Sequence, residues 1–325
     1  MTRIGYHCSH EQYPPSSLLR WVIAAEAAGF ECAMCSDHLH PWTEDQGHSG
    51  FAWSFLGAAL QATSLRFGVV TVPGGWRYHP AVLAQAAATL DEMFPDRFWL
   101  AAGSGEALNE HVVGRGWPGK EERNARLAEG VDIMRALWRG EEVTRNGSIP
   151  VESARVYSLP ARPPRVYAAA LTPETARFAG AWADGLITTG RPPEDLQQMI
   201  DAFAEGGAAG KPLIVQAGFA LGAKEDEALA EACAEWGCLF LDPDLLANLR
   251  RPADFAAAGA ALRPEDLRGK LPVVTSAQEA IDWLADYIEL GVEEVQLHCV
   301  NRRQDEFIEL FGERVLPALE RSSEG

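Results

Sequence analysis

Short apolar runs alternate with amphipathic segments along nearly the whole chain, as they do in parallel α/β proteins. The runs that predict strands are 3–6, 30–34, 66–72, 97–102, 165–170, 185–188, 213–221 and 292–300. Apolar residues at helical spacing predict helices at 16–28, 51–63, 80–93, 120–138, 173–182, 194–205, 225–236, 277–290 and 306–319. Eight strands, each followed by a helix, predict an α/β fold of the (β/α)8 TIM-barrel type. An open, doubly wound sheet is the alternative.

Two segments break this alternation. Residues 140–159 follow the fourth helix and contain Asn146-Gly147, a signal for a tight β-hairpin. Residues 237–271 lie beyond the seventh strand and its helix, and they are irregular, with several breaks at proline. We interpret both as insertions, the second as an insertion or a lid. Because 325 residues is an ordinary length for one such barrel, we expect a single domain over 1–325.

Charge and cysteine content narrow the function classes. The net charge of -18 argues against nucleic acid as a partner, since phosphates require a basic face. No apolar stretch approaches the roughly 20 residues that span a bilayer, so we expect no membrane partner and a cytoplasmic location. The 6 cysteines show no paired framework. Cys32 and Cys35 would point to opposite faces of a strand, which favours buried thiols over a functional pair.

A barrel places its chemistry on the loops that follow the C-terminal ends of the strands. The informative residues of this chain lie in those places: Glu11 after the first strand, Asp37, His38 and Trp42 after the second, Trp76 after the third, Gly105, Glu106 and Asn109 after the fourth, and Thr172 after the fifth. Glu106 follows a Gly-x-Gly turn, where partial desolvation raises a carboxyl pKa toward general-acid use.

Each of these residues also has a plainer interpretation. The histidines could bond local carbonyl groups, and Trp42 and Trp76 could cap the core at the barrel mouth. The pair Gly103 and Gly105 could be an ordinary turn. His38 and His40 form an H-x-H that could instead hold a metal ion for hydrolysis. That pair follows the second strand and is crowded by Pro41, so we assign no metal site.

Three strings carry a family resemblance. They are Ser36-Asp37-His38 with Pro41-Trp42, the segment 78–89 (Tyr-His-Pro-Ala-Val-Leu-Ala-Gln-Ala-Ala-Ala-Thr), and the segment 103–110 (Gly-Ser-Gly-Glu-Ala-Leu-Asn-Glu). They resemble the bacterial luciferase-like superfamily, and most closely its deazaflavin-dependent glucose-6-phosphate dehydrogenase branch. The resemblance runs from residue 4 to the C-terminus and is weakest over 236–271.

The resemblance implies a role for each matching residue. His38 resembles the base that takes the proton of the substrate hydroxyl as hydride leaves for the coenzyme, Trp42 the indole that steadies the charged intermediate, and Glu106 the acid facing the reactive ring. The remaining assignments are coenzyme binding for Asp37, Val70, Thr71, Gly105, Asn109, Leu171 and Thr172, and substrate binding for Glu11, Trp76 and Arg191. The family also implies a cis peptide near Val70-Thr71.

Two departures limit this comparison. Where the branch grips a sugar phosphate with cations, only Arg191 and Lys270 lie near the expected places, so we do not expect glucose 6-phosphate as the substrate. A glycine pair that binds the coenzyme phosphate is replaced here by Leu171-Thr172, although Thr172 can still cap the following helix. Together these departures resemble a side branch that uses an ordinary flavin.

The sequence therefore predicts an oxidoreductase that moves hydride between a flavin-type coenzyme and a small alcohol-like or sugar-like molecule. FMN is preferred over coenzyme F420, and both stay open. The alternatives are a flavin-dependent monooxygenase, a metal-dependent hydrolase and a non-catalytic flavin-binding barrel. We also expect a homodimer.

Overall fold

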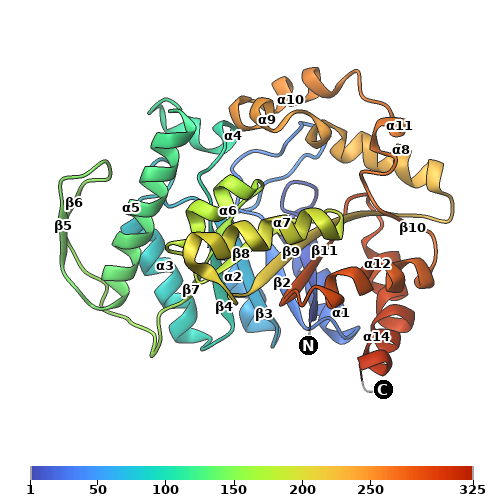
Figure 1. Ribbon diagram of the computed structural model, residues 1–325, viewed down its shortest axis with the longest axis horizontal. Coiled ribbons are helices and arrows are strands. Elements are labelled where there is room, and N and C mark those ends of the chain that lie inside the picture. The colour runs from blue at the N-terminus through green and yellow to red at the C-terminus, as the bar shows by residue number, and fades with distance from the viewer. Residues whose placement is uncertain (1, 324–325) are drawn as a thin grey trace.

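The computed structural model describes residues 2–323 and shows a ring of parallel strands surrounded by helices (Figure 1). In ring order the strands are β11 (Glu294–Cys299), β1 (Arg3–Cys8), β2 (Cys32–Cys35), β3 (Arg66–Thr71), β4 (Phe98–Ala102), β7 (Arg165–Ala169), β8 (Gly185–Thr189) and β9 (Leu213–Leu221). β9 pairs with both β8 and β11, which closes the ring. The predicted (β/α)8 barrel is confirmed, and the open sheet is excluded.

The helices that cover the outside of the barrel follow the sequence pattern closely. They are α1 (Pro15–Ala27), α2 (Ala52–Ala62), α3 (Pro80–Met93), α5 (Lys120–Trp138), α6 (Pro173–Gly180), α7 (Pro193–Phe203), α12 (Ala277–Glu289), α13 (Gln304–Leu310) and α14 (Leu316–Ser323). A π turn at Ala204–Ala208 extends α7, and another at Phe311–Val315 joins α13 to α14. The short α4 (Ala107–Glu110) and a 3-10 turn (His111–Val113) follow β4. Among these residues no helix has the length and apolar character needed to cross a membrane.

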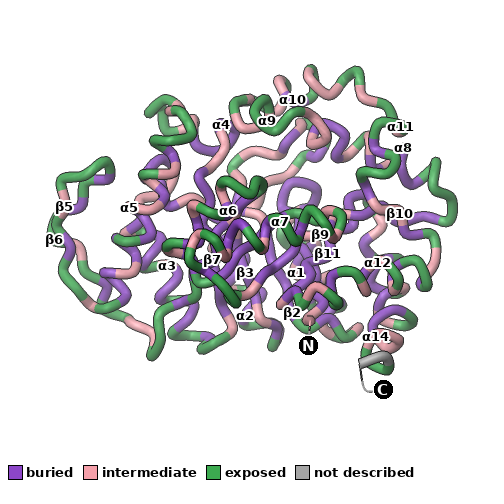
Figure 2. Tube along the Cα trace, in the orientation of Figure 1, coloured by how far each residue is buried: buried purple, intermediate pink, exposed green. Residues whose placement is uncertain are grey.

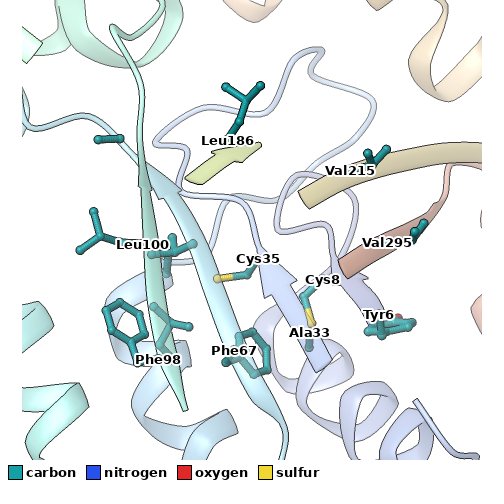
Figure 3. Packing of buried hydrophobic residues seen from close by; sticks show 14 of the residues in the cluster. Tyr6, Cys8, Ala33, Cys35, Phe67, Phe98, Leu100, Leu186, Val215 and Val295 are labelled. Carbon is teal, nitrogen blue, oxygen red and sulfur yellow. The ribbon is translucent and has the colours of Figure 1, made fainter. Parts of the chain in front are cut away.

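Both faces of each strand are buried, which explains why the strands read as continuous apolar runs. Outward-facing side chains pack against the helices, and Figure 3 shows several of them, including Tyr6, Phe67 and Leu100, on neighbouring strands. Side chains on the alternate positions fill the barrel interior: Met34, Trp99, Ala101, Tyr167, Ile187 and Ile214. A side chain at Gly68 would collide with the Trp99 ring, with Cβ only 2.1 Å from it. The barrel interior is therefore filled by packed side chains.

The first insertion is an antiparallel hairpin, as the Asn-Gly signal predicts. β5 (Val143–Arg145) pairs with β6 (Val151–Ala154), and the hairpin projects from the side of the barrel (Figure 1). Most of it is exposed, in contrast to the buried barrel strands (Figure 2).

The second insertion forms a layer of helices over the C-terminal end of the barrel (Figure 1, top). We call residues 223–274 the lid; its elements are α8 (Glu225–Trp236), a 3-10 turn (Gly237–Phe240), α9 (Pro243–Asn248), α10 (Pro252–Gly259), α11 (Pro264–Leu267) and β10 (Val273–Val274). Leu229 and Trp236 of α8 share an apolar cluster with Phe255 and Leu267. The helix over 225–236 thus belongs to this layer, while α12 covers the barrel wall, with Trp283 5.6 Å from Phe219.

The structure tests one expectation about the cysteine thiols and one about a cis peptide bond. All six cysteines are free, and Cys32 and Cys35 are buried, as predicted. No peptide bond among the described residues is cis, so the expected cis bond at Val70-Thr71 is wrong. β3 stays in regular parallel register with β4 through the pair Thr71 and Ala102.

Candidate active site

His38 and Glu11 meet at the mouth of the barrel, from the loops that follow β2 and β1. His38 Nδ1 lies 3.2 Å from Glu11 Oε1, and the side chains are 17% and 2% exposed. The ring is near enough for a charge contact but is not aligned for a full hydrogen bond. Such geometry often tightens only when a substrate is bound. Glu11, which we expected at the substrate, therefore lies behind the predicted base.

The second oxygen of Glu11 is held by two hydroxyl groups. Ser9 Oγ donates to Glu11 Oε2 at 3.1 Å, and Ser36 Oγ donates to the same atom at 2.7 Å. Burial alone would raise the pKa of the Glu11 carboxyl, but His38 and the Ser36 hydrogen bond outweigh burial and lower the pKa. Glu11 is therefore a carboxylate at neutral pH, facing an imidazole.

Trp42 forms a wall between His38 and the lid. Its ring lies 4.9 Å from the His38 ring at 63°, and 5.3 Å from the Phe255 ring of α10 at 74°. The Trp42 amide donates to Gln46 Oε1, and Gln46 Nε2 donates to the carbonyl of Glu235 in α8. The lid and the loop that carries His38 are thus packed and hydrogen-bonded as one unit.

Glu106 approaches the same space from the loop after β4. Burial raises the pKa of the Glu106 carboxyl; His38 acts to lower it and Glu11 to raise it, so both residues are within electrostatic reach. Gly105 precedes it with φ +82°, and a Cβ there would meet Glu110, Trp117 and Val72, each at 3.1 Å. Only glycine fits this turn without strain. Glycine at 105 is thus required to place Glu106, while a direct coenzyme contact stays a prediction.

Asp37 is the centre of a buried hydrogen-bond network. Thr71 Oγ1 donates to Asp37 Oδ2 at 2.8 Å, and Tyr78 donates to Oδ1 at 2.9 Å. Arg77 Nη1 lies 3.3 Å from the same Oδ1, and its Nε lies 3.5 Å from Glu110 Oε1. Burial raises the pKa of Glu110, which Arg77 opposes. The structure therefore joins Asp37 and Thr71, but with protein partners on both carboxylate oxygens.

Asn109 fixes the backbone of the loop that carries His38. Its Oδ1 accepts from the amides of Leu39 and His40, at 2.9 and 3.3 Å. His40 Nδ1 lies 3.1 Å from the Leu108 carbonyl, so His38 and His40 have different surroundings. Among the residues that the structure describes, no three His, Cys, Asp or Glu side chains are grouped to hold a metal ion.

Small or partly exposed residues lie at the barrel mouth, above the filled interior. Val70 and Ala169 face the interior of a closed barrel, yet both are only partly buried. At Gly103 a Cβ would meet nothing closer than 3.7 Å. His7 and His298 line another side, with ring centroids 4.5 Å apart. Partly exposed Val70 and Ala169 therefore lie at the same end of the barrel as His38.

Four predicted positions make contacts that do not involve His38. Trp76 packs against Trp117 at 5.4 Å, with the Arg126 guanidinium 4.9 Å over its ring. Thr172 caps α6 by accepting from the Thr175 amide at 3.2 Å, as predicted, and Leu171 beside it is 55% exposed. Arg191 spans the ends of β7 and β8.

The contacts of Arg191 are with neutral groups. Its Nη1 donates to the Leu171 carbonyl at 3.3 Å, and its Nη2 donates to Thr188 Oγ1 at 3.0 Å. It forms no ion pair within the described part of the chain.

The structure thus brings Glu11, His38, Trp42 and Glu106 to one mouth. The sequence predicts no role for Arg77, which pairs with Asp37, or for Glu110, which pairs with Arg77. It also predicts none for Ser36, which donates to Glu11. The signal was present for Glu110, because it closes the string at 103–110, but its pairing with Arg77 depends on the fold.

Known proteins show the same combination of fold and sequence. Residues 1–294 match the family described as luciferase-like monooxygenase. The chain is 35% identical to an F420-dependent glucose-6-phosphate dehydrogenase of Beutenbergia cavernae, with 98% of each chain covered. It is 33% identical to the protein of that name from Mycobacterium tuberculosis, again covering 98% of each.

A solved structure agrees with these relatives. It is described as an F420-dependent secondary alcohol dehydrogenase in complex with an F420-acetone adduct, and it superposes with a TM-score of 0.90 at 30% identity over 98% of this chain and 99% of that one. The resemblance predicted from the sequence is therefore confirmed, and this chain belongs to the luciferase-like monooxygenase family.

Proposed function

We propose that this enzyme is an F420-dependent dehydrogenase that oxidises a small secondary alcohol, with His38 as the base. The observation that carries the proposal is His38 held between the Glu11 carboxylate and the Trp42 ring at the barrel mouth. The relatives described above are named for F420, and their names support F420 in place of the expected FMN.

The residues at the mouth fit such a coenzyme. Val70 and Ala169 are partly exposed above the filled interior of the barrel, and a Cβ at Gly103 would meet no atom closer than 3.7 Å. Because Asp37 and Asn109 are occupied by protein partners, their part is to hold the loop that faces the coenzyme. When bound, the coenzyme supplies the hydride acceptor.

His38 would move the proton of the substrate hydroxyl. Its Nδ1 faces Glu11, which leaves Nε2 to accept that proton. The Glu11 carboxylate then stabilises the imidazolium, and Ser9 and Ser36 keep the carboxylate in place. Trp42 and Phe255 exclude water from one side. Glu106, whose pKa is raised by burial, approaches the same space from the loop after β4.

The apolar composition of the lid favours a neutral substrate over a sugar phosphate. The cluster that faces Trp42 consists of apolar residues, including Phe255, Leu267 and Leu271. Arg302, the cation after β11, is engaged by Glu235 at 2.7 Å. Glucose 6-phosphate is the second candidate because the 33% and 35% identical relatives carry that name.

The experiment is a parallel comparison with purified protein. F420 and FMN are titrated side by side, and each loaded protein is mixed with 2-propanol or with glucose 6-phosphate. We expect F420 to bind more tightly and 2-propanol to reduce it. Tighter binding of FMN with oxygen consumption would favour a monooxygenase, and turnover of glucose 6-phosphate alone would replace the alcohol by the sugar phosphate.

A further inference from the structure

Two cations at the start of α5 lie beside the active-site loop without an acidic partner. Lys120 is the first residue of α5, and Arg123 lies one turn later on the same side of the helix. Lys120 Nζ donates to Ser104 Oγ at 2.9 Å, two residues before Glu106. In the described part of the chain, neither cation has a carboxylate within ion-pair distance.

Arg123 is buried, although one of its hydrogen-bond donors has no partner. It is 5% exposed, and its guanidinium lies 4.6 Å over the Trp117 ring. Nη1 donates to the Pro118 carbonyl at 3.0 Å, but the buried Nε has no hydrogen-bond partner. A buried donor without a partner is costly, and natural proteins seldom leave one.

Two other enclosed arginines of this chain pair with carboxylates. Arg66 pairs with Glu293 and Glu294, at 2.9 and 2.8 Å. Arg77 pairs in the same way with two carboxylates, those of Asp37 and Glu110. Lys120 and Arg123 differ from them because neither has a described carboxylate within ion-pair distance.

The electrostatics agree with a missing negative charge. Burial lowers the pKa of Lys120, Arg123 lowers it further, and Glu174 and Asp244 only partly oppose the shift from longer range. Burial likewise lowers the pKa of Arg123, opposed by Asp244. An anion placed between the two cations would reverse both effects.

We infer that Lys120 and Arg123 bind the anionic, phosphate-bearing end of the coenzyme, in addition to any contact at Leu171-Thr172. This inference rests on the proposed function, because it assumes F420. F420 carries its ring at one end and its phosphate and carboxylate groups at the other. Ser104 and Glu106 are at most about 7 Å apart along the chain, so the cation bonded to Ser104 is within reach of the far end of a ligand whose ring lies against Glu106.

A phosphate on the substrate would present the same chemistry, and the test separates the two sources. Lys120→Met and Arg123→Met each remove one positive charge at the site. Arg139→Met is the matched control, because Arg139 directly follows the far end of α5 and pairs with exposed Glu141. Thermal melting of each variant checks folding, and Lys120, as an exposed residue, tolerates replacement better than buried Arg123.

Two ligands are titrated by fluorescence: F420, and its ring-ribityl fragment, which lacks the phosphate and the tail. We expect both site variants to weaken F420 binding by about tenfold to a hundredfold, the value of one charge-assisted hydrogen bond. Binding of the fragment should not change, and Lys120→Arg should restore much of the F420 affinity. Arg139→Met should bind both ligands like the wild type.

Each other outcome overturns the inference in a distinguishable way. Unchanged F420 affinity in both site variants rejects the inference and leaves the proposed function intact. An unchanged F420 affinity with a raised KM for glucose 6-phosphate assigns the cations to the substrate instead. Failure of the wild-type protein to bind F420 rejects the inference and the proposed function together.

Discussion

Replacing Glu11 by glutamine isolates the contribution of the carboxylate behind His38. The substitution keeps the size of the side chain and leaves an oxygen that can accept from Ser9 and Ser36. It removes the charge 3.2 Å from His38 Nδ1. Because the pKa of Glu11 is lowered, the wild-type side chain is charged at neutral pH, and the substitution removes a real charge.

The expected loss follows from the distance. Two unit charges 3.2 Å apart interact by about 5 kcal/mol at an effective dielectric constant of about 20. If about half of the positive charge has developed on His38 in the transition state, Glu11→Gln forfeits about 2.6 kcal/mol, or about 80-fold in the rate of hydride transfer. Coenzyme affinity should not change.

The assay is single-turnover reduction of bound F420 by 2-propanol, followed by loss of the absorbance of the oxidised coenzyme. Ser9→Ala is the control, because it removes one hydrogen bond to Glu11 but keeps the carboxylate; its loss should be at most about tenfold. A rate for Glu11→Gln no lower than that of Ser9→Ala would refute the assignment of Glu11 to His38.

Three further outcomes test the site. His38→Ala should lower turnover by about a hundredfold or more and leave F420 affinity nearly unchanged; an unchanged single-turnover rate would remove His38 from the mechanism. Glu106→Gln should raise the free energy of unfolding at neutral pH, because burial raises the pKa of this carboxyl and its ionised form weakens the fold. That gain should vanish in denaturant titrations at a pH below the ordinary carboxyl pKa, where both states are protonated, and a gain that persists there would contradict burial as its cause. Phe255→Ala should cost about 3–5 kcal/mol of stability and also raise the KM for alcohol by loosening Trp42. Phe307→Ala, on α13 outside the barrel, should lower stability alone. Equal KM values in the two variants would separate the lid from substrate binding.

The barrel was predictable because its strands are buried on both faces. Residues 80–93, 120–138 and 213–221 were predicted with the bounds that the structure shows. The helix over 225–236 was found too, but its packing was not. An amphipathic pattern shows that a helix covers something apolar and does not show what it covers. Trp236 packs with Phe255 and Leu267 of the lid, and its ring also lies 4.6 Å from the His298 ring of β11.

The site residues were predictable as a group, since strand ends converge in a barrel. Their individual partners were not, because side-chain pairing depends on three-dimensional distances. Glu11 was expected at the substrate and lies against His38, and Asn109 was expected at the coenzyme and binds the His38 loop. Lys120 and Arg123 could not be singled out from the sequence, because only the structure shows that Arg123 is buried and that Lys120 is bonded to Ser104.

The lid leaves the barrel and returns to it at a single point. The Gly222 amide donates to the Val274 carbonyl at 3.2 Å, and β10 pairs with the end of β9 at Ala220 and Leu221. A closed loop of this kind can change length at little cost, since each doubling adds only about 0.6 kcal/mol of closure entropy. The lid can therefore be exchanged as one unit, by evolution or by engineering. Such an exchange would change what the mouth admits, and it would leave the His38 loop in place only if the contacts of Phe255 with Trp42 and of Glu235 with Gln46 were kept.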